Sequence, residues 1–170
     1  MDDLTRLAIA ARDGDRVALA AFVRHSQAEV WRLCAHLVDR ASADDLTQDV
    51  YVRALPALAR FRGDASARTW LLSIAHRTCA DALRRRVRRR RADAIAPRPE
   101  PSADRSGEVD VGTLVAELDR DRRTAFVLTQ LLGLSYAEAA EVCAVPVGTI
   151  RSRVARAREQ LIAAHQADAV

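Results

Sequence analysis

Residues 135–158 read SYAEAAEVCAVPVGTIRSRVARAR, which is the pattern of two short helices joined by a tight turn. Ser135 is a good helix N-cap, and Glu138 three residues later completes a capping box. Proline cannot continue a helix interior but suits a first helical turn, so Pro146 marks the boundary between the two helices. The second helix then carries an apolar stripe at helical spacing, made of Ile150, Val154, Ala157 and Leu161. The run therefore predicts a helix-turn-helix.

The side of the second helix that faces away from the stripe is suited to DNA. It has small and hydrogen-bonding residues near its start and arginines behind them, and such residues contact base edges and phosphates in a major groove. The candidate DNA-binding residues are Gly148, Thr149, Arg151, Ser152, Arg153 and Arg156. A basic second helix also occurs as plain solvated surface, because the helix dipole alone favours cations near a C-terminus.

The composition favours helices throughout and a nucleic-acid partner. The chain has 170 residues, enough for one ordinary domain or two small ones, and 49% of them are hydrophobic but only 4% aromatic. All 27 basic residues are arginine, which binds phosphate in a fixed fork. Seven of these arginines lie in residues 84–91, RRRVRRRR, and the following residues 92–118 are acidic. Charge clustered in this way suits a nucleic-acid partner better than uniform basicity does.

Several classes of site are not indicated. The cysteines Cys34, Cys79 and Cys143 are odd in number and far apart, so they predict buried thiols rather than a disulfide framework or a zinc site. No spacing indicates catalytic residues, a phosphate-binding glycine loop, a metal or a cofactor. No apolar run approaches the roughly 20 residues needed to span a bilayer, and no signal peptide is evident. We expect a cytoplasmic, reduced protein that is not inserted in a membrane and is not an enzyme.

The chain divides into two helical units. In residues 1–90, helical spacing covers residues 4–12, 16–37, 42–58 and 66–90, with Ser42 as a candidate cap for the third helix. Residues 91–111 contain Pro97, Pro99 and Pro101 and predict a flexible linker. Residues 112–170 contain helices at 113–118 and 120–132 and then the helix-turn-helix. The expected fold is all-α, with two small helical domains joined by a flexible Pro-rich linker.

Three stretches, in this order, resemble a known family. They are SADDLTQDVYVRAL at 42–55, FRGDASARTWLLSIAHRTCADALRRR at 61–86 and LSYAEAAEVCAVPVGTIRSRVARAREQL at 134–161. They resemble the polymerase-binding helix, the promoter-melting and −10 segment, and the −35 domain of the extracytoplasmic-function (ECF) sigma factors of bacterial RNA polymerase. The resemblance covers both units. Only residues 118–123 depart from the usual pattern, because they are more charged than the family usually is at this position.

The resemblance implies a promoter-specificity subunit that has no catalytic site of its own. Its partners would be promoter DNA and core RNA polymerase, through the beta-prime and beta subunits. Many members of the family are also held by an anti-sigma factor, which makes such a protein a further candidate partner.

The resemblance also implies roles for particular residues. The polymerase-binding set is Asp45, Gln48, Asp49 and Arg53. The −10 and melting set comprises a loop that captures a flipped base and arginines that bind the DNA backbone: Arg60, Phe61, Arg62, Asp64, Ser66, Arg77, Arg84 and Arg85. Phe61 is equally well explained as a core anchor, and Trp70 is expected to be core rather than a base-stacking platform.

Two other classes of protein remain compatible with a helix-turn-helix. A free-standing regulator would bind operators as a dimer, and it would need a dimerisation face or ligand pocket that no segment supplies. A DNA-processing enzyme, such as a recombinase, would need a nucleophile and metal-binding carboxylates in the first unit. A stable dimer that binds DNA without polymerase would favour the regulator. DNA strand cleavage by the purified chain with Mg²⁺ would favour the enzyme.

Overall fold

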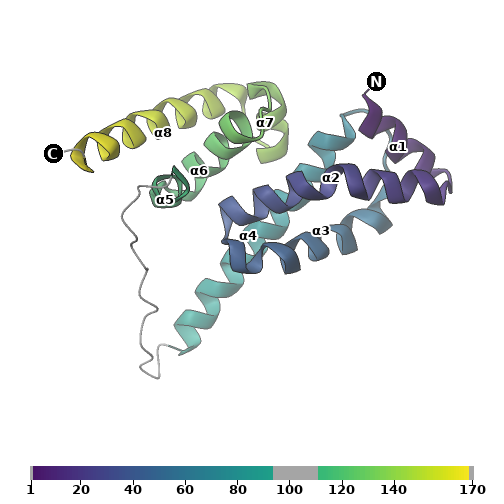
Figure 1. The fold of residues 1–170 in the computed structure, drawn as a ribbon, viewed down its shortest axis with the longest axis horizontal. Helices are drawn as coiled ribbons and strands as arrows, with labels where there is room; N and C mark the ends of the chain where they lie inside the picture. The colour runs from purple at the N-terminus through teal and green to yellow at the C-terminus, as the bar shows by residue number, and fades with distance from the viewer. Residues whose placement is uncertain (1, 94–110, 169–170) are drawn as a thin grey trace.

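Aspartate side chains cap the starts of the first two helices. The computed structural model describes residues 2–93 and 111–168 (Figure 1). Asp2 accepts a hydrogen bond from the Thr5 backbone at the start of α1 (Asp3–Arg12), and Asp15 does the same for two amides of α2 (Arg16–Leu37). Such caps satisfy amides that have no partner inside the helix. The sequence predicted the bounds of both helices to within a residue.

The third and fourth helices follow the expected order with two differences. A 3-10 turn, η1 (Arg40–Ser42), leads into α3 (Ala43–Leu58). Ser42 was predicted to cap α3, but its side chain makes no capping bond; its hydroxyl accepts a hydrogen bond from Arg86 instead, at 2.6 Å. The longest helix, α4 (Ala67–Asp93), continues past residue 90, where the linker was predicted to begin. Residues 94–110 of that predicted linker lie outside the described residues, and its last residue, Val111, begins the next helix.

The second half begins with two short helices. They are α5 (Val111–Glu117) and α6 (Arg120–Phe126), and α6 continues into a π-helical turn, η2 (Val127–Leu131). Helix α5 begins and ends slightly earlier than the predicted 113–118. The predicted helix at 120–132 is confirmed as the combination of α6 and η2.

The predicted helix-turn-helix is present as α7 (Tyr136–Cys143) and α8 (Val147–Asp168). The capping box is formed: the Ser135 hydroxyl accepts from the Glu138 amide at 3.2 Å, and the Glu138 carboxylate accepts from the Ser135 amide at 2.8 Å. Ala144 ends α7 in the left-handed region, with φ 54°. Its position lets the Val145 amide donate back to the Ala140 carbonyl at 3.1 Å, the type of closure that glycine usually provides.

The core of the first half lies between α2, α3 and α4. The largest fully buried side chains there come from these helices and include Phe22, Val30, Leu33, Val50, Leu71 and Leu72. Thr5 connects the start of α1 to this layer, because its hydroxyl accepts a hydrogen bond from the Ala67 amide at 2.9 Å. In the second half, most of the predicted stripe on α8 is buried: Ile150, Val154 and Ala157 are at most 1% exposed, and Leu161 is half-buried.

The two halves pack against each other in this structure. Helix α4 contacts α7, and α2 contacts α5, α6 and η2. The buried apolar residues of both halves belong to one continuous cluster. In Figure 1 the green and yellow helices accordingly lie along one side of α2 and α4, and the last turns of α4 extend away from them.

Replacing Ala144 by glycine should stabilise the protein. A left-handed conformation costs an L-residue about 1–2 kcal/mol, whereas glycine adopts it freely but loses more backbone entropy on folding, so we expect a net gain of about 0.5–1 kcal/mol. Urea unfolding followed by circular dichroism would measure it. The control, Ala155→Gly in the exposed interior of α8, should instead cost about 1 kcal/mol. Destabilisation by both substitutions would show that the turn is not strained.

Candidate nucleic-acid interface

Helix α8 presents most of its predicted DNA-binding residues to solvent. The exposed ones are Gly148, Arg151, Ser152 and Arg156, and the half-buried ones are Thr149 and Arg153. The Arg153 guanidinium is paired with the Asp121 carboxylate of α6. Two further bonds fasten α8 at points farther along it: Arg122 donates to Gln160 at 3.1 Å, and Arg158 donates to Gln130 at 2.5 Å. Arg153 and Arg158 are therefore bonded to α6 and η2, whereas Arg151 and Arg156 face solvent.

The predicted backbone-binding arginines lie on the outer side of α4. Arg77, Arg84 and Arg85 are all exposed. Arg77 folds back along its own helix and donates to the Ser73 carbonyl at 3.1 Å and the Ser73 hydroxyl at 3.0 Å. These short contacts within one helix leave Arg77 on the surface.

Asp81 joins this side of α4 to α3. Its carboxylate accepts from Arg53 at 2.8 Å and from Arg84 at 2.5 Å. The two guanidinium groups, Arg53 first, lower the pKa of Asp81 below its usual value. A residue predicted to bind polymerase and a residue predicted to bind DNA thus share one carboxylate.

Arg86 has a structural role in the arginine run. It donates to Asp39 at 2.5 Å and to the Ser42 hydroxyl at 2.6 Å, which ties the later part of α4 to η1. The other arginines of residues 84–90 are exposed, so most of the run's charge faces solvent.

The loop before α4 holds the predicted base-capture residues. Arg60, Arg62 and Asp64 are exposed, and the last two form an ion pair at 3.0 Å. Ser66 is half-buried and shares a hydrogen bond with Thr69 at 2.9 Å. Phe61 is only 5% exposed.

Phe61 and Trp70 pack together at the base of this loop. Their ring centroids are 5.1 Å apart, a usual distance for a favourable aromatic pair. Of the two roles left open for Phe61, the structure shows the core anchor. Trp70 is half-buried and packs against the core, which agrees with the prediction.

The predicted polymerase-binding face of α3 is exposed. Asp45, Gln48, Asp49 and Arg53 all reach solvent, and Leu46, Val50 and Ala54 are buried on the opposite side. Beside this face, an open groove of about 460 Å³ lies between α2 and α3 and includes Trp31, Asp44 and Gln48 in its lining. The Trp31 indole donates to the Asp44 carboxylate at 2.8 Å, and Arg40 lies 5.8 Å from the ring centre.

A polar clamp connects the two halves. The Arg68 guanidinium pairs with Glu29 of α2, with its Nε 3.0 Å from the carboxylate, and it also donates to the Leu132 carbonyl of the second half. The pKa of Arg68 is raised, chiefly by the hydrogen bond with Glu29. No sequence motif indicated this clamp, because its members lie far apart in the chain.

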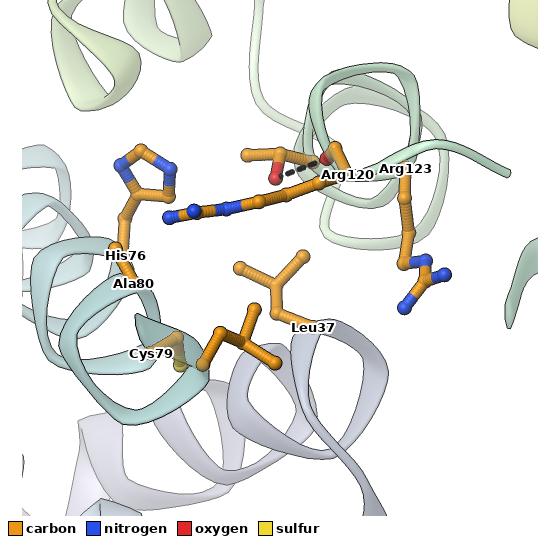
Figure 2. Close-up of a pocket in the computed structure, with 8 residues that line it drawn as sticks. Leu37, His76, Cys79, Ala80, Arg120 and Arg123 are labelled. Carbon is orange, nitrogen blue, oxygen red and sulfur yellow. Dashed lines mark hydrogen bonds between the residues drawn. The ribbon is translucent and has the colours of Figure 1, made fainter. Parts of the chain in front are cut away.

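His76 also lies where the two halves meet, a contact that we call the seam. Figure 2 shows His76 on α4 beside the side chain of Arg120, which extends across from α6. The two residues line a cavity of about 10 Å³, and His76 also forms a hydrogen bond with the Val142 backbone. Burial and then the positive charge of Arg120 lower the pKa of His76 below 6.5. No sequence pattern had singled out this histidine.

Two classes of site are not found in the described part of the chain. It contains no group of three or more histidine, cysteine or carboxylate residues that could hold a metal ion. No helix among the described residues is long and apolar enough to cross a bilayer.

Comparison with known proteins decides the family. Residues 22–89 match the family described as Sigma-70 region 2, and residues 108–161 match Sigma-70, region 4. The chain is 51% identical to the probable RNA polymerase sigma-C factor of Mycobacterium bovis, over 97% of this chain and 92% of that one. It is 33% identical to the ECF RNA polymerase sigma-E factor of Escherichia coli, over 87% and 86% of the two chains.

The chain belongs to the ECF sigma factors of bacterial RNA polymerase.

The sigma factor is therefore a promoter-specificity subunit that works with core RNA polymerase and has no catalytic site of its own. Solved structures agree with the fold. CnrH in complex with the cytosolic domain of CnrY has a TM-score of 0.75 and 28% identity, covering 98% of this chain and 99% of that one. RpoE from Bartonella quintana, in complex with the anti-sigma factor NepR, has a TM-score of 0.73 and 25% identity, covering 84% and 93%.

Acid should destabilise the sigma factor partly through His76. Since its pKa is lowered in the folded state, the unfolded chain binds more protons as the pH falls below about 6.5, and stability falls with it. Protonation also places a new charge beside Arg120 and Arg77, which the nearby Asp121 only partly offsets. We expect His76→Gln to lose less stability than the wild type between about pH 7.5 and about pH 5.5. Urea unfolding at both values would measure this, and equal losses would contradict it.

Proposed function

We propose that the sigma factor distributes promoter recognition over three separate exposed faces. The outer face of α3 binds the beta-prime subunit. The loop at residues 60–66 and the outer face of α4 open the −10 element and hold its displaced strand. The exposed face of α8 reads the −35 element in the major groove, and the second half also contacts the beta subunit.

The observation that carries the proposal is the arrangement of charge on α8. This helix is buried along Ile150, Val154 and Ala157, and its exposed side has Gly148 and Ser152 near the start, where a recognition helix meets base edges. The exposed guanidinium groups behind them suit phosphates and purine edges.

We propose that these tasks are divided between the two helical units predicted from the sequence. Residues 1–90, extended by the last turn of α4, bind polymerase and melt DNA, and residues 112–170 recognise the upstream element. The family matches at 22–89 and 108–161 fall largely within these two units and support the division.

Since the bacterial chromosome and its polymerase lie in the cytoplasm, we place the sigma factor there. The anti-sigma complexes among the structural relatives make an anti-sigma factor a proposed partner as well.

The proposed pocket for the flipped base involves Arg60, Arg62, Asp64 and Ser66, with Phe61 as its floor. The buried ring of Phe61 lies beneath the loop, in tilted contact with the ring of Trp70. Flipping a base costs a few kcal/mol, which stacking and phosphate contacts offset. Arg77, Arg84 and Arg85 lie farther along α4, where the same strand would continue.

Arg151→Ala should weaken recognition of the −35 element and leave polymerase binding intact. Loss of one base or phosphate contact costs about 1–3 kcal/mol, so run-off transcription from a −35-dependent promoter should fall at least several-fold. The matched control is Arg158→Ala, which removes the same charge from the same helix at a side chain that is bonded to Gln130. Equal effects of the two variants on transcription, or loss of polymerase binding with Arg151→Ala, would rule out the proposed role of Arg151.

Asp49→Lys should weaken association with core polymerase. Reversing a charge at an interface replaces attraction by repulsion, and we expect a loss of about 1–3 kcal/mol in binding free energy. Fluorescence anisotropy with labelled sigma factor and purified core enzyme would measure the affinity. The control is Asp3→Lys, which changes the net charge equally at an exposed position on α1. Unaltered affinity of Asp49→Lys would remove this residue from the interface.

A further inference from the structure

Two cysteines that are far apart in sequence meet in the core of the first half. The Sγ atoms of Cys34 on α2 and Cys79 on α4 are 3.6 Å apart, and both residues are at most 1% exposed. The sequence predicted buried thiols and no disulfide framework, and 45 positions separate the pair. We propose that Cys34 and Cys79 form a redox site, which a small peroxide oxidises to a reversible intramolecular disulfide.

The distance between the sulfur atoms supports this assignment. A disulfide needs its sulfurs at about 2.05 Å, so the pair must approach by roughly 1.5 Å. The two thiols already face each other across packed helices, and one donates a hydrogen bond to the other. Small movements of the two side chains and helices are then enough to close the bond.

The surroundings of the pair make the two sulfurs unequal. The hydrogen bond with Cys79 lowers the pKa of Cys34, and a contact with the Thr47 side chain lowers it further. The same hydrogen bond and burial raise the pKa of Cys79. Since the thiolate is the reactive form, Cys34 is the attacking sulfur and Cys79 the resolving one.

The reaction is balanced with hydrogen peroxide as the oxidant. The Cys34 thiolate attacks one peroxide oxygen, the O–O bond breaks, and the leaving hydroxide takes a proton to become water. The resulting sulfenic acid is attacked by the Cys79 sulfur, which loses its proton as the S–S bond forms and a second water leaves. Two thiols are oxidised by two electrons and one peroxide is reduced to two waters.

A small cavity lies beside the pair, where the two halves meet. Cys79 lines the cavity of about 10 Å³ that it shares with His76 and Arg120 (Figure 2). A cavity of this size holds about one water molecule, and Cys34 does not line it. Hydrogen peroxide therefore reaches the Cys34 sulfur only when the packing around the pair opens.

Cys143 provides an internal comparison. It is half-buried on α7, burial raises its pKa to about 11, and no sulfur lies beside it in the described part of the chain. The proposal therefore concerns one particular pair out of the three that the cysteines allow.

The test uses the full chain, first reduced and then exposed to a small excess of hydrogen peroxide. We expect the intact mass to fall by two hydrogen atoms, and a non-reducing digest to show the Cys34 peptide joined to the Cys79 peptide. Dithiothreitol should restore the original mass. The thermal midpoint of the oxidised chain should rise on the order of 5 °C, because the disulfide restricts the unfolded chain.

Two controls distinguish selective pairing of Cys34 with Cys79 from unselective oxidation of the cysteines. Cys143→Ser should behave as the wild type does. The same treatment in concentrated urea should give mixed pairings, since the fold no longer selects the partners. The proposal is overturned if the native chain forms no Cys34–Cys79 link, forms it no more selectively than the unfolded chain, or is oxidised first at Cys143. Neither control requires a variant of the proposed pair, so a folding defect cannot obscure the result.

Discussion

The packing of α4 on two of its sides is the constraint on which the other features depend. Leu71, Ala75 and Cys79 are buried against the helices of the first half, and the seam around Arg68 and His76 meets the second half. Only the side with Arg77, Asp81 and Arg84 is left to solvent. A helix held on two sides presents its third side in a fixed orientation, which the proposed binding of displaced DNA by this side would require. The exposed arginines are therefore positioned by residues that are themselves buried.

The chain uses one type of cation for two purposes. Arg86, Arg68 and Arg153 are paired with carboxylates and hold helices together, whereas Arg151 and Arg85 face solvent. An arginine that is already paired must lose that partner before it binds a phosphate, so the free arginines bind DNA at less cost. Total charge thus overstates the number of side chains ready to bind nucleic acid, and the pairing in the folded chain shows which ones are free.

Chemically distinctive groups lie at or near the seam between the halves. His76 is held near Arg120 with a lowered pKa, and one turn along α4 the sulfur of Cys79 meets that of Cys34. Both features depend on burial: removal from water disfavours the charged imidazole and keeps the two thiols in contact. The packing of α4 against both halves therefore sets the chemical state of groups that lie away from the proposed DNA-binding faces.

Local chemistry was enough to predict the helices, the capping box at Ser135 and the apolar stripe of α8, because caps and periodicity act over a few neighbouring residues. The family motifs likewise predicted the sigma-factor fold, and the exposure of the predicted α3 and α8 faces follows from the same periodicity. The Arg68–Glu29 clamp, the hydrogen bond of Ser42 to Arg86, the burial of Phe61 against Trp70 and the contact of Cys34 with Cys79 were decided only by the tertiary structure. Each joins residues that are separate in the chain, and which of them meet depends on how the helices pack, which no local pattern specifies.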